Sequence, residues 1–255
     1  NMATAMLKGI LKSGEVEASD MIASAKSDKT REKIEKELGI RKADTNAQVV
    51  DFADVVFLAV KPQFLEGVLD EIRDSVKAGQ IFISIAPGKT LQWLGERLGE
   101  NTKVIRTMPN TPAMVGEGMT ALCVNELVTE EEIALAVKLC DTFGKTEVIP
   151  EHLMDAVVGV SGSSPAYVFM FLEAMADAAV ADGMPRAQAY KFAAQSVLGS
   201  AKLMLETGKH PGELKDMVCS PAGTTIQAVR VLEEKGFRSA VIEAQTECVK
   251  KAKGM

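Results

Sequence analysis

Two continuous apolar runs, residues 55–60 (VVFLAV) and 81–85 (IFISI), constrain the fold of this chain more than any other feature. Each run ends abruptly, the first at Lys61-Pro62 and the second at Ala86-Pro87-Gly88. A strand with one face in water alternates apolar and polar residues, whereas a strand of a parallel sheet is buried on both faces and is apolar throughout. The two runs therefore predict strands of a parallel sheet that is covered by helices on both faces.

Helical patterns separate these runs from further strand patterns up to about residue 150. The predicted strands are residues 20–24, 55–60, 81–85, 103–108, 119–124 and 146–149, with helices at 29–39, 46–53, 64–76, 90–98 and 130–143. This alternation predicts a Rossmann-like, doubly wound α/β domain, which we place at residues 1–152. The chain opens in a helical pattern at Asn1 without an N-cap, so we expect a first strand and a glycine fingerprint upstream.

Strand patterns stop after Leu153, and an all-helical domain is predicted for residues 153–255. Small and apolar residues lie on more than one face of its two longest helices, residues 166–182 and 186–207. A helix that is apolar all round is normally buried, and a domain of ~100 residues has little interior for several such helices. We expect an intertwined homodimer through residues 160–250. The alternative is that these helices fill the core of a monomer.

Charge and cysteine usage limit the partners. The formal net charge of −6 and the pI near 5.2 indicate neither a nucleic-acid surface nor binding to an anionic membrane. No apolar run approaches the ~18 residues of a membrane span, and no signal peptide pattern opens the chain. The four cysteines form no CxxC pair and have no nearby histidine, so we expect no metal site and no disulfide framework. Free thiols fit a reducing compartment, and we expect a cytoplasmic protein.

Residues 210–227 (HPGELKDMVCSPAGTTIQ) place small residues where one predicted helix ends and the next begins at Thr224. The first N–H groups of a helix lack partners within the helix, and its dipole favours negative charge, so such a corner can hold an anion. Gly223 lets a ligand approach the backbone. An ordinary helix corner capped by Ser or Thr is the alternative, and spacing alone favours it.

Doubly wound domains bind ligands at the carboxyl ends of their strands. The loops expected there are residues 23–27, 59–62, 86–88 and 109–112. The first of them offers Ser24, Lys26 and Ser27 where an acid commonly holds the ribose 2′-hydroxyl of NADH. This favours a 2′-phosphate, and hence NADPH over NADH. A solvated surface lysine at position 26 is the alternative.

Hydrolysis is not indicated, because the chain contains no HExxH, GxSxG or paired-carboxylate pattern. His152 and His210 lie at helix starts, where a capping or surface role is simpler than a catalytic one. Hydride transfer needs a positioned cofactor and acceptor rather than a protein nucleophile. A nucleotide domain followed by an anion site therefore favours an oxidoreductase.

Four motifs resemble those of Δ1-pyrroline-5-carboxylate reductases. They are residues 58–62 (LAVKP), 106–118 (RTMPNTPAMVGEG), 160–168 (VSGSSPAYV) and 210–229 (HPGELKDMVCSPAGTTIQAV), and the last is the most specific. The resemblance, which runs from Asn1 to about Lys250, implies NAD(P)H-dependent reduction of 1-pyrroline-5-carboxylate to L-proline. It also implies a helical domain like that at the C-terminus of 6-phosphogluconate dehydrogenase. Homodimers, which in this family often assemble into decamers, would build each site from the nucleotide domain of one subunit and the helical domain of the other.

The resemblance also assigns the site residues. The substrate carboxylate is expected to meet the Ser220 side chain and the N–H groups of Gly223, Thr224 and Thr225, and the Thr225 hydroxyl to face the ring nitrogen, positioning it first and handling a proton second. Glu151 matches an acid near the substrate, with a helix cap as the alternative. The cofactor contacts are expected from Asn1 and Met2 at the pyrophosphate, Ser24 and Lys26 near the 2′-phosphate, Asn46 at the adenine-side ribose, Val60 and Lys61 along the chain, and Ala86, Pro87, Asn110 and Thr111 near the nicotinamide.

Two other functions stay open. One is another two-domain dehydrogenase of this architecture, acting on a β-hydroxyacid or a different cyclic imine. A β-hydroxyacid enzyme would normally need a lysine base in the first interdomain helix, and residues 168–182 contain no lysine. The other is a non-catalytic nucleotide-binding relative, which the missing first strand would favour. Ser164 and Ala222, where many relatives of the resembled family carry Gly, remove a little backbone freedom.

Overall fold

The computed structural model describes residues 2–254, and the chain divides into two compact units. The first unit runs to Gly162 and also takes in the residues from Lys251 onward, and the second is Ser163–Lys250. The boundary expected after His152 lies earlier, within the 3-10 turn η4 (Glu151–Leu153).

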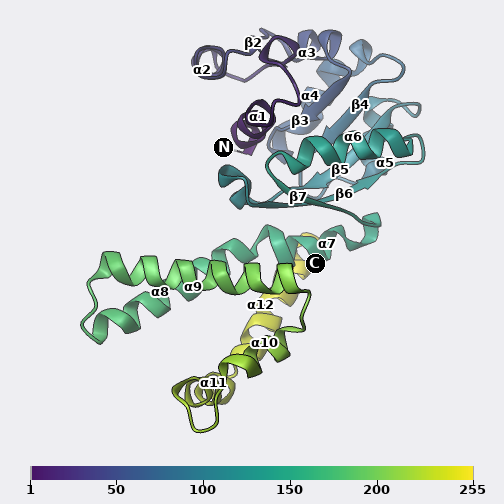
Figure 1. The fold of residues 1–255 in the computed structure, drawn as a ribbon. Coiled ribbons are helices and arrows are strands. Elements are labelled where there is room, and N and C mark those ends of the chain that lie inside the picture. The colour runs from purple at the N-terminus through teal and green to yellow at the C-terminus, as the bar shows by residue number, and fades with distance from the viewer. Residues whose placement is uncertain (1, 255) are drawn as a thin grey trace. The chain divides into compact units, whose positions relative to one another are not determined.

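A five-stranded sheet with the order β3-β4-β5-β6-β7 forms the centre of the first unit (Figure 1). The strands β3 (Val55–Leu58), β4 (Ile81–Ser84) and β5 (Lys103–Met108) are parallel, as the apolar runs predict. In contrast, β6 (Gly118–Val124) is antiparallel to β5 and parallel to β7 (Gly144–Val148). Only the 3-10 turn η3 (Thr111–Val115) joins β5 to β6, which is too short for the crossover that a parallel pair needs.

Helices bury both faces of this sheet, which explains why its strands are apolar throughout. Phe82 packs in one cluster with side chains of α3 (Asn46–Phe52), α4 (Pro62–Ile72) and α5 (Leu91–Leu98). Ile81 and Ile83 face the other way and pack with Ala136 of α6 (Glu130–Asp141). The 3-10 turn η2 (Arg73–Ser75) follows α4. Helix α1 (Met2–Ser13) packs closely through Gly9, because a Cβ there would lie 2.9 Å from the Cβ of Phe143.

A separate parallel pair, β1 (Ile22–Ala23) and β2 (Arg41–Lys42), lies between η1 (Ala18–Asp20) and α3, with α2 (Asp28–Leu38) joining its strands. The sequence did not predict β2, because two exposed basic residues carry no strand pattern.

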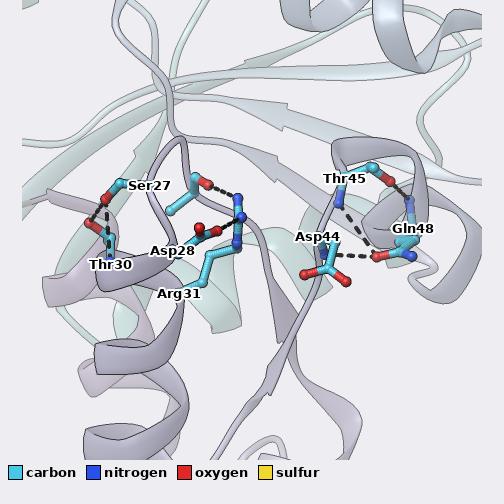
Figure 2. A network of polar contacts seen from close by, with 8 residues as sticks. Ser27, Asp28, Thr30, Arg31, Asp44, Thr45 and Gln48 are labelled. Atoms are coloured by element: carbon cyan, nitrogen blue, oxygen red, sulfur yellow. Dashed lines mark hydrogen bonds and ion pairs between the residues drawn. The ribbon is translucent and has the colours of Figure 1, made fainter.

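Capping bonds hold the loops that follow β1 and β2 (Figure 2). Ser27 accepts a hydrogen bond from the Thr30 N–H at the start of α2, and Thr45 and Gln48 form a capping box at the start of α3. The Arg31 guanidinium, which is paired with Asp28, also donates to the Ala25 carbonyl at 2.7 Å. The bonds made by Ser27 and Arg31 hold the loop that connects β1 to α2 in place.

The rest of the described chain is helical, as predicted. The first unit ends with η4, α7 (Met154–Val157) and a π-helical turn, η5 (Val158–Gly162). The second unit contains α8 (Ser164–Ala181), α9 (Arg186–Thr207), α10 (Pro211–Val218), α11 (Thr224–Glu234) and all but the last two residues of α12 (Phe237–Ala252). Helices α8 and α9 lie side by side (Figure 1). Large apolar side chains on both are solvent-exposed, including Phe169 at 63% and Phe192 at 68%.

The helical run from Glu151 to Ala181 is long and apolar enough to cross a membrane by length and composition alone. This corrects the expectation that no run approaches such a length, since consecutive short helices and α8 join into one run of 31 residues. A single run of this kind is weak evidence for a membrane span, because a helix that packs against protein on every side has the same composition.

Candidate functional site

A cavity of about 560 Å³ lies along the β1 and β3 strands in the first unit. Ser24, directly after β1, and Val60, just after β3, line it together with Asn46 at the start of α3. The carboxyl ends of β1 and β3 thus border one cavity, and a doubly wound sheet binds a dinucleotide at these ends. Three of the residues expected to contact a nicotinamide dinucleotide, Ser24, Asn46 and Val60, thus lie at one cavity. Most of its lining is apolar, and Ser24 and Asn46 are the side chains there that would suit the hydroxyl groups of a ribose.

Polar side chains at this end of the cavity are linked to one another. The Ser24 hydroxyl donates to Asn46 Oδ1 at 2.5 Å, and Asn46 Nδ2 donates to Glu71 Oε2 at 2.7 Å. The backbone N–H of Asn46 donates to the other oxygen of the same carboxylate at 3.0 Å. Glu71 was not predicted from the sequence. It lies 25 residues from Asn46 on another helix, so no local pattern connects the two.

The basic side chains expected near the cofactor, Lys26 and Lys61, are both exposed. Within residues 2–254 neither forms an ion pair, and the Lys26 ammonium lies 4.9 Å from the centroid of the Phe64 ring. The electron-rich face of an aromatic ring attracts a cation, so Phe64 contributes to the position of the Lys26 ammonium.

The residues expected near the nicotinamide follow β4 and β5. Ala86 is buried and its N–H donates to Ser84 Oγ at 3.3 Å, whereas Pro87 is exposed. The Asn110 side chain is 8% exposed, donates to the Ser161 carbonyl at 3.0 Å and accepts from the Met119 N–H at 2.8 Å. Its amide thus holds the loop after β5 in place.

The remaining expected cofactor residues are Thr111, Met2 and Asn1. Thr111 is exposed at the start of η3. Met2 packs on a cluster that contains Met6 and Phe143. Asn1 lies outside the described residues.

Glu151 is tied to the α/β unit by two bonds to one of its oxygens. Its Oε1 accepts from the Leu91 N–H at the start of α5 at 2.7 Å and from the Arg106 guanidinium at 3.0 Å. The Arg106 side chain is only 8% exposed, so Glu151 supplies the opposite charge that a buried guanidinium needs. Burial, with a further contribution from Glu151, raises the pKa of the neighbouring Cys123 thiol to about 12. Arg106 was missed, although a charged residue in an apolar strand is itself a sign of a buried ion pair.

The corner between α10 and α11 is a tight turn in the second unit. The Gly223 N–H donates to the Ser220 carbonyl at 3.0 Å, with Pro221 and Ala222 in the two central positions. Ala222 has φ = 58°, the left-handed region that this position of a type II turn requires. Close packing places the Ser220 hydroxyl against Gly223, because a Cβ on Gly223 would collide with Ser220 Oγ.

Helix α11 starts without a side-chain cap. Gly223 occupies its N-cap position in an extended conformation, whereas Ser or Thr side chains cap α2, α3, α5 and α6. The first N–H groups of α11, at Thr224 and Thr225, are therefore not taken by an N-cap side chain. Together with the Ser220 hydroxyl they form a group of donors suited to a carboxylate.

Neither a group of potential metal ligands nor a disulfide is found within residues 2–254. That part of the chain contains no cluster of three or more His, Cys, Asp or Glu side chains that could hold a metal ion. Its four cysteines are free, with Cys123 and Cys140 buried.

Comparison with known proteins identifies the family. Residues 151–255 match the model described as pyrroline-5-carboxylate reductase dimerisation, and residues 1–88 match NADP oxidoreductase, coenzyme F420-dependent. The pyrroline-5-carboxylate reductase of Escherichia coli K12 is 55% identical over 99% of this chain and 94% of its own length. The chain belongs to the pyrroline-5-carboxylate reductase family.

Solved reductases of this family have the same fold as this chain. A pyrroline-5-carboxylate reductase from Coxiella burnetii superposes with a TM-score of 0.93 at 33% identity, covering 99% of this chain and 94% of that one. The Plasmodium falciparum pyrroline carboxylate reductase, solved with NADP bound, gives a TM-score of 0.89 at 28% identity, with the same coverage. These likenesses confirm the predicted family and the predicted pairing of a Rossmann-like domain with a helical dimerisation domain.

Proposed function

We propose that this reductase family member reduces the C=N bond of 1-pyrroline-5-carboxylate to give L-proline, using NADPH, with NADH as the weaker alternative. The uncapped start of α11, with Ser220 beside it and Thr225 in its first turn, is the observation that carries the proposal. The names of the relatives support the substrate, and the NADP bound to the Plasmodium relative supports the cofactor.

The substrate carboxylate binds at the start of α11 in this proposal. The N–H groups of Gly223, Thr224 and Thr225 and the hydroxyl of Ser220 donate to it, and the positive end of the helix dipole favours its charge. The Gly223 N–H has to exchange its bond to the Ser220 carbonyl for this role or share it between the two acceptors. Glu151 lies near the substrate in this proposal and keeps its hydrogen bonds to Leu91 and Arg106.

In this proposal the Thr225 hydroxyl orients the ring nitrogen and exchanges a proton with it. A hydroxyl can accept from the N–H of a protonated imine and can donate to the amine that forms. A bound NADPH would supply a hydride to the imine carbon. The π electrons of the C=N bond would then become the lone pair of the amine nitrogen. Besides Ser24, Asn46 and Val60, the residues proposed to hold the cofactor are Asn1, Met2, Lys26, Lys61, Ala86, Pro87, Asn110 and Thr111.

The proposal also covers the oligomeric state, the cellular location and the partners of the protein. The match of residues 151–255 to a dimerisation model and the exposed apolar side chains of α8 and α9 support a homodimer, which we propose can assemble further into decamers. The four free cysteines support a cytoplasmic location. The acidic balance of the chain supports a small-molecule partner rather than nucleic acid or an anionic membrane.

The purified protein should consume NADPH, followed by absorbance, when 1-pyrroline-5-carboxylate is added. Thr225→Ala should lower kcat by about 10- to 100-fold, the effect of losing one hydrogen bond in the transition state. Gln227→Ala, an exposed change on the same helix, should keep wild-type rates. Protein that binds NADPH but does not turn over with this imine would contradict the assignment.

A further inference from the structure

The carboxylate of Glu71 holds Asn46 by two hydrogen bonds at the nucleotide end of the cavity. One oxygen accepts from the backbone N–H at 3.0 Å and the other from the side-chain Nδ2 at 2.7 Å. Glu71 lies near the end of α4 and Asn46 is the first residue of α3, so the carboxylate also sits at a helix N-terminus, where its charge is favourable. The backbone bond positions the carboxylate, and the Nδ2 bond then fixes the orientation of the Asn46 side-chain amide.

That orientation determines what Ser24 can offer to a ligand. With Nδ2 committed to Glu71, Asn46 presents Oδ1 to Ser24 and accepts its hydroxyl proton at 2.5 Å. A serine hydroxyl has a single proton to donate. In this arrangement Ser24 has only lone pairs left for a ligand, and it acts as an acceptor.

An acceptor at this position distinguishes the two nicotinamide cofactors. The ribose 2′-hydroxyl of NADH can donate to Ser24, whereas the 2′-phosphate of NADPH carries acceptor oxygens and negative charge and needs donors. Glu71 thus opposes the 2′-phosphate by holding the Asn46 N–H groups away from it and by adding a negative charge. Lys26 is the side chain nearby in sequence that acts in the opposite direction.

We propose that Glu71 is a specificity-determining residue, which limits the preference for NADPH over NADH by fixing the Asn46 amide and through it the Ser24 hydroxyl. This inference rests on the proposed use of a nicotinamide cofactor and on the predicted place of Ser24 and Asn46 near its adenosine half. Glu71 itself makes no predicted contact with the cofactor and acts through Asn46 and Ser24, which do.

Glu71→Gln tests the inference by direct binding. The substitution keeps the side-chain size, removes the charge and leaves a single oxygen to accept from Asn46, so the Asn46 amide can turn and Ser24 can donate. Calorimetry with NADP⁺ and with NAD⁺, on the full chain and without turnover, should show an affinity gain of about fivefold or more for NADP⁺ and little change for NAD⁺. Thermal unfolding checks that the variant is folded.

Asp70→Asn removes the same charge one residue earlier on α4, from an exposed side chain, and should leave the ratio of the two affinities unchanged. Ser24→Ala should cost more NADP⁺ affinity in the Glu71→Gln background than in the wild-type background, because only the freed hydroxyl donates to the phosphate. This coupling distinguishes reorientation from a general change in charge.

An unchanged ratio in Glu71→Gln, or an equal gain in Asp70→Asn, would overturn the inference while leaving the reductase assignment intact. A wild-type chain that binds neither NADP⁺ nor NAD⁺ would contradict the proposed function and this inference with it.

Discussion

Ala222 is the only non-glycine residue between residues 2 and 254 with a positive φ, and it lies in the turn that leads into α11. The left-handed region costs a residue with a Cβ roughly 1–2 kcal/mol, a cost that glycine avoids. The strain falls directly before Gly223, the first of the three residues whose N–H groups we propose bind the substrate carboxylate. Backbone strain of this kind concentrates at functional sites, where the surrounding structure maintains it.

Ala222→Gly should raise the free energy of unfolding by about 0.5–1 kcal/mol, because the relieved strain exceeds the extra entropy that glycine gives to the unfolded chain. Urea unfolding of both proteins measures the difference. Ala228→Gly, an exposed position inside α11, should instead lower stability by about 1 kcal/mol. Equal or lower stability of Ala222→Gly would show that the turn holds Ala222 without strain.

Individual site residues differ in how far the sequence could predict them. The helix start at Thr224 was predictable, because the Ser-Pro-Ala-Gly break precedes an amphipathic run. The bond between Glu71 and Asn46 was not, since it joins two helices that only the folded chain brings together. The two bonds that hold Glu151 are also long-range, with Leu91 and Arg106 lying 60 and 45 residues away.

Secondary structure elements were predictable where burial sets their pattern. The runs at β3 and β4 are apolar because both of their faces are covered, and the helices that follow them, α4 and α5, carry Pro and Thr at their starts. Strand β2 and the antiparallel direction of β6 were not predicted. The first depends on pairing rather than on pattern, and the second on the length of one connection.

Helix α6 starts with a capping box, in which Thr129 and Glu132 each accept from the other's backbone N–H. The Glu132 carboxylate also accepts from the Lys103 ammonium of β5 at 2.5 Å, and these bonds lower the pKa of Glu132. A carboxyl with a lowered pKa contributes stability above its unfolded pKa of about 4.3, and the contribution disappears as the pH falls through the lower folded value.

Glu132→Gln should therefore lower the free energy of unfolding by about 0.5–1 kcal/mol at pH 7, since Gln keeps the capping box and loses only the charge. The difference from wild type should be smaller in denaturant titrations below the lowered folded pKa of Glu132 than at pH 7, because the side chain is then neutral in both proteins. Glu130→Gln, in the same first turn, measures the helix-dipole effect alone and should cost less. The same loss at both pH values would indicate that packing, rather than charge, is responsible.

At the scale of the whole chain, the two units differ in how far a single copy of the chain buries their apolar side chains. The four apolar core clusters of the described residues all belong to the first unit. In the second unit the fully buried apolar side chains are alanines, Ala176, Ala189 and Ala193, while four consecutive large residues of α8, Val168 to Phe171, are exposed. A helix that is apolar on every face needs protein around it. A second copy of this chain supplies that protein in the proposed homodimer.

Sedimentation velocity at micromolar concentration should accordingly show a dimer or a larger assembly. The double substitution of Phe169 and Phe192 by Asp places charges at positions that are 63% and 68% exposed in the single chain. If these side chains are buried between subunits, the variant should sediment as a monomer, because an unpaired charge in an apolar interface costs several kcal/mol. Phe64→Asp, at a 49% exposed position on α4 of the first unit, should leave the assembly unchanged. A wild-type chain that sediments as a stable folded monomer would refute the dimer, and the exposed apolar faces of α8 and α9 would then need a different partner.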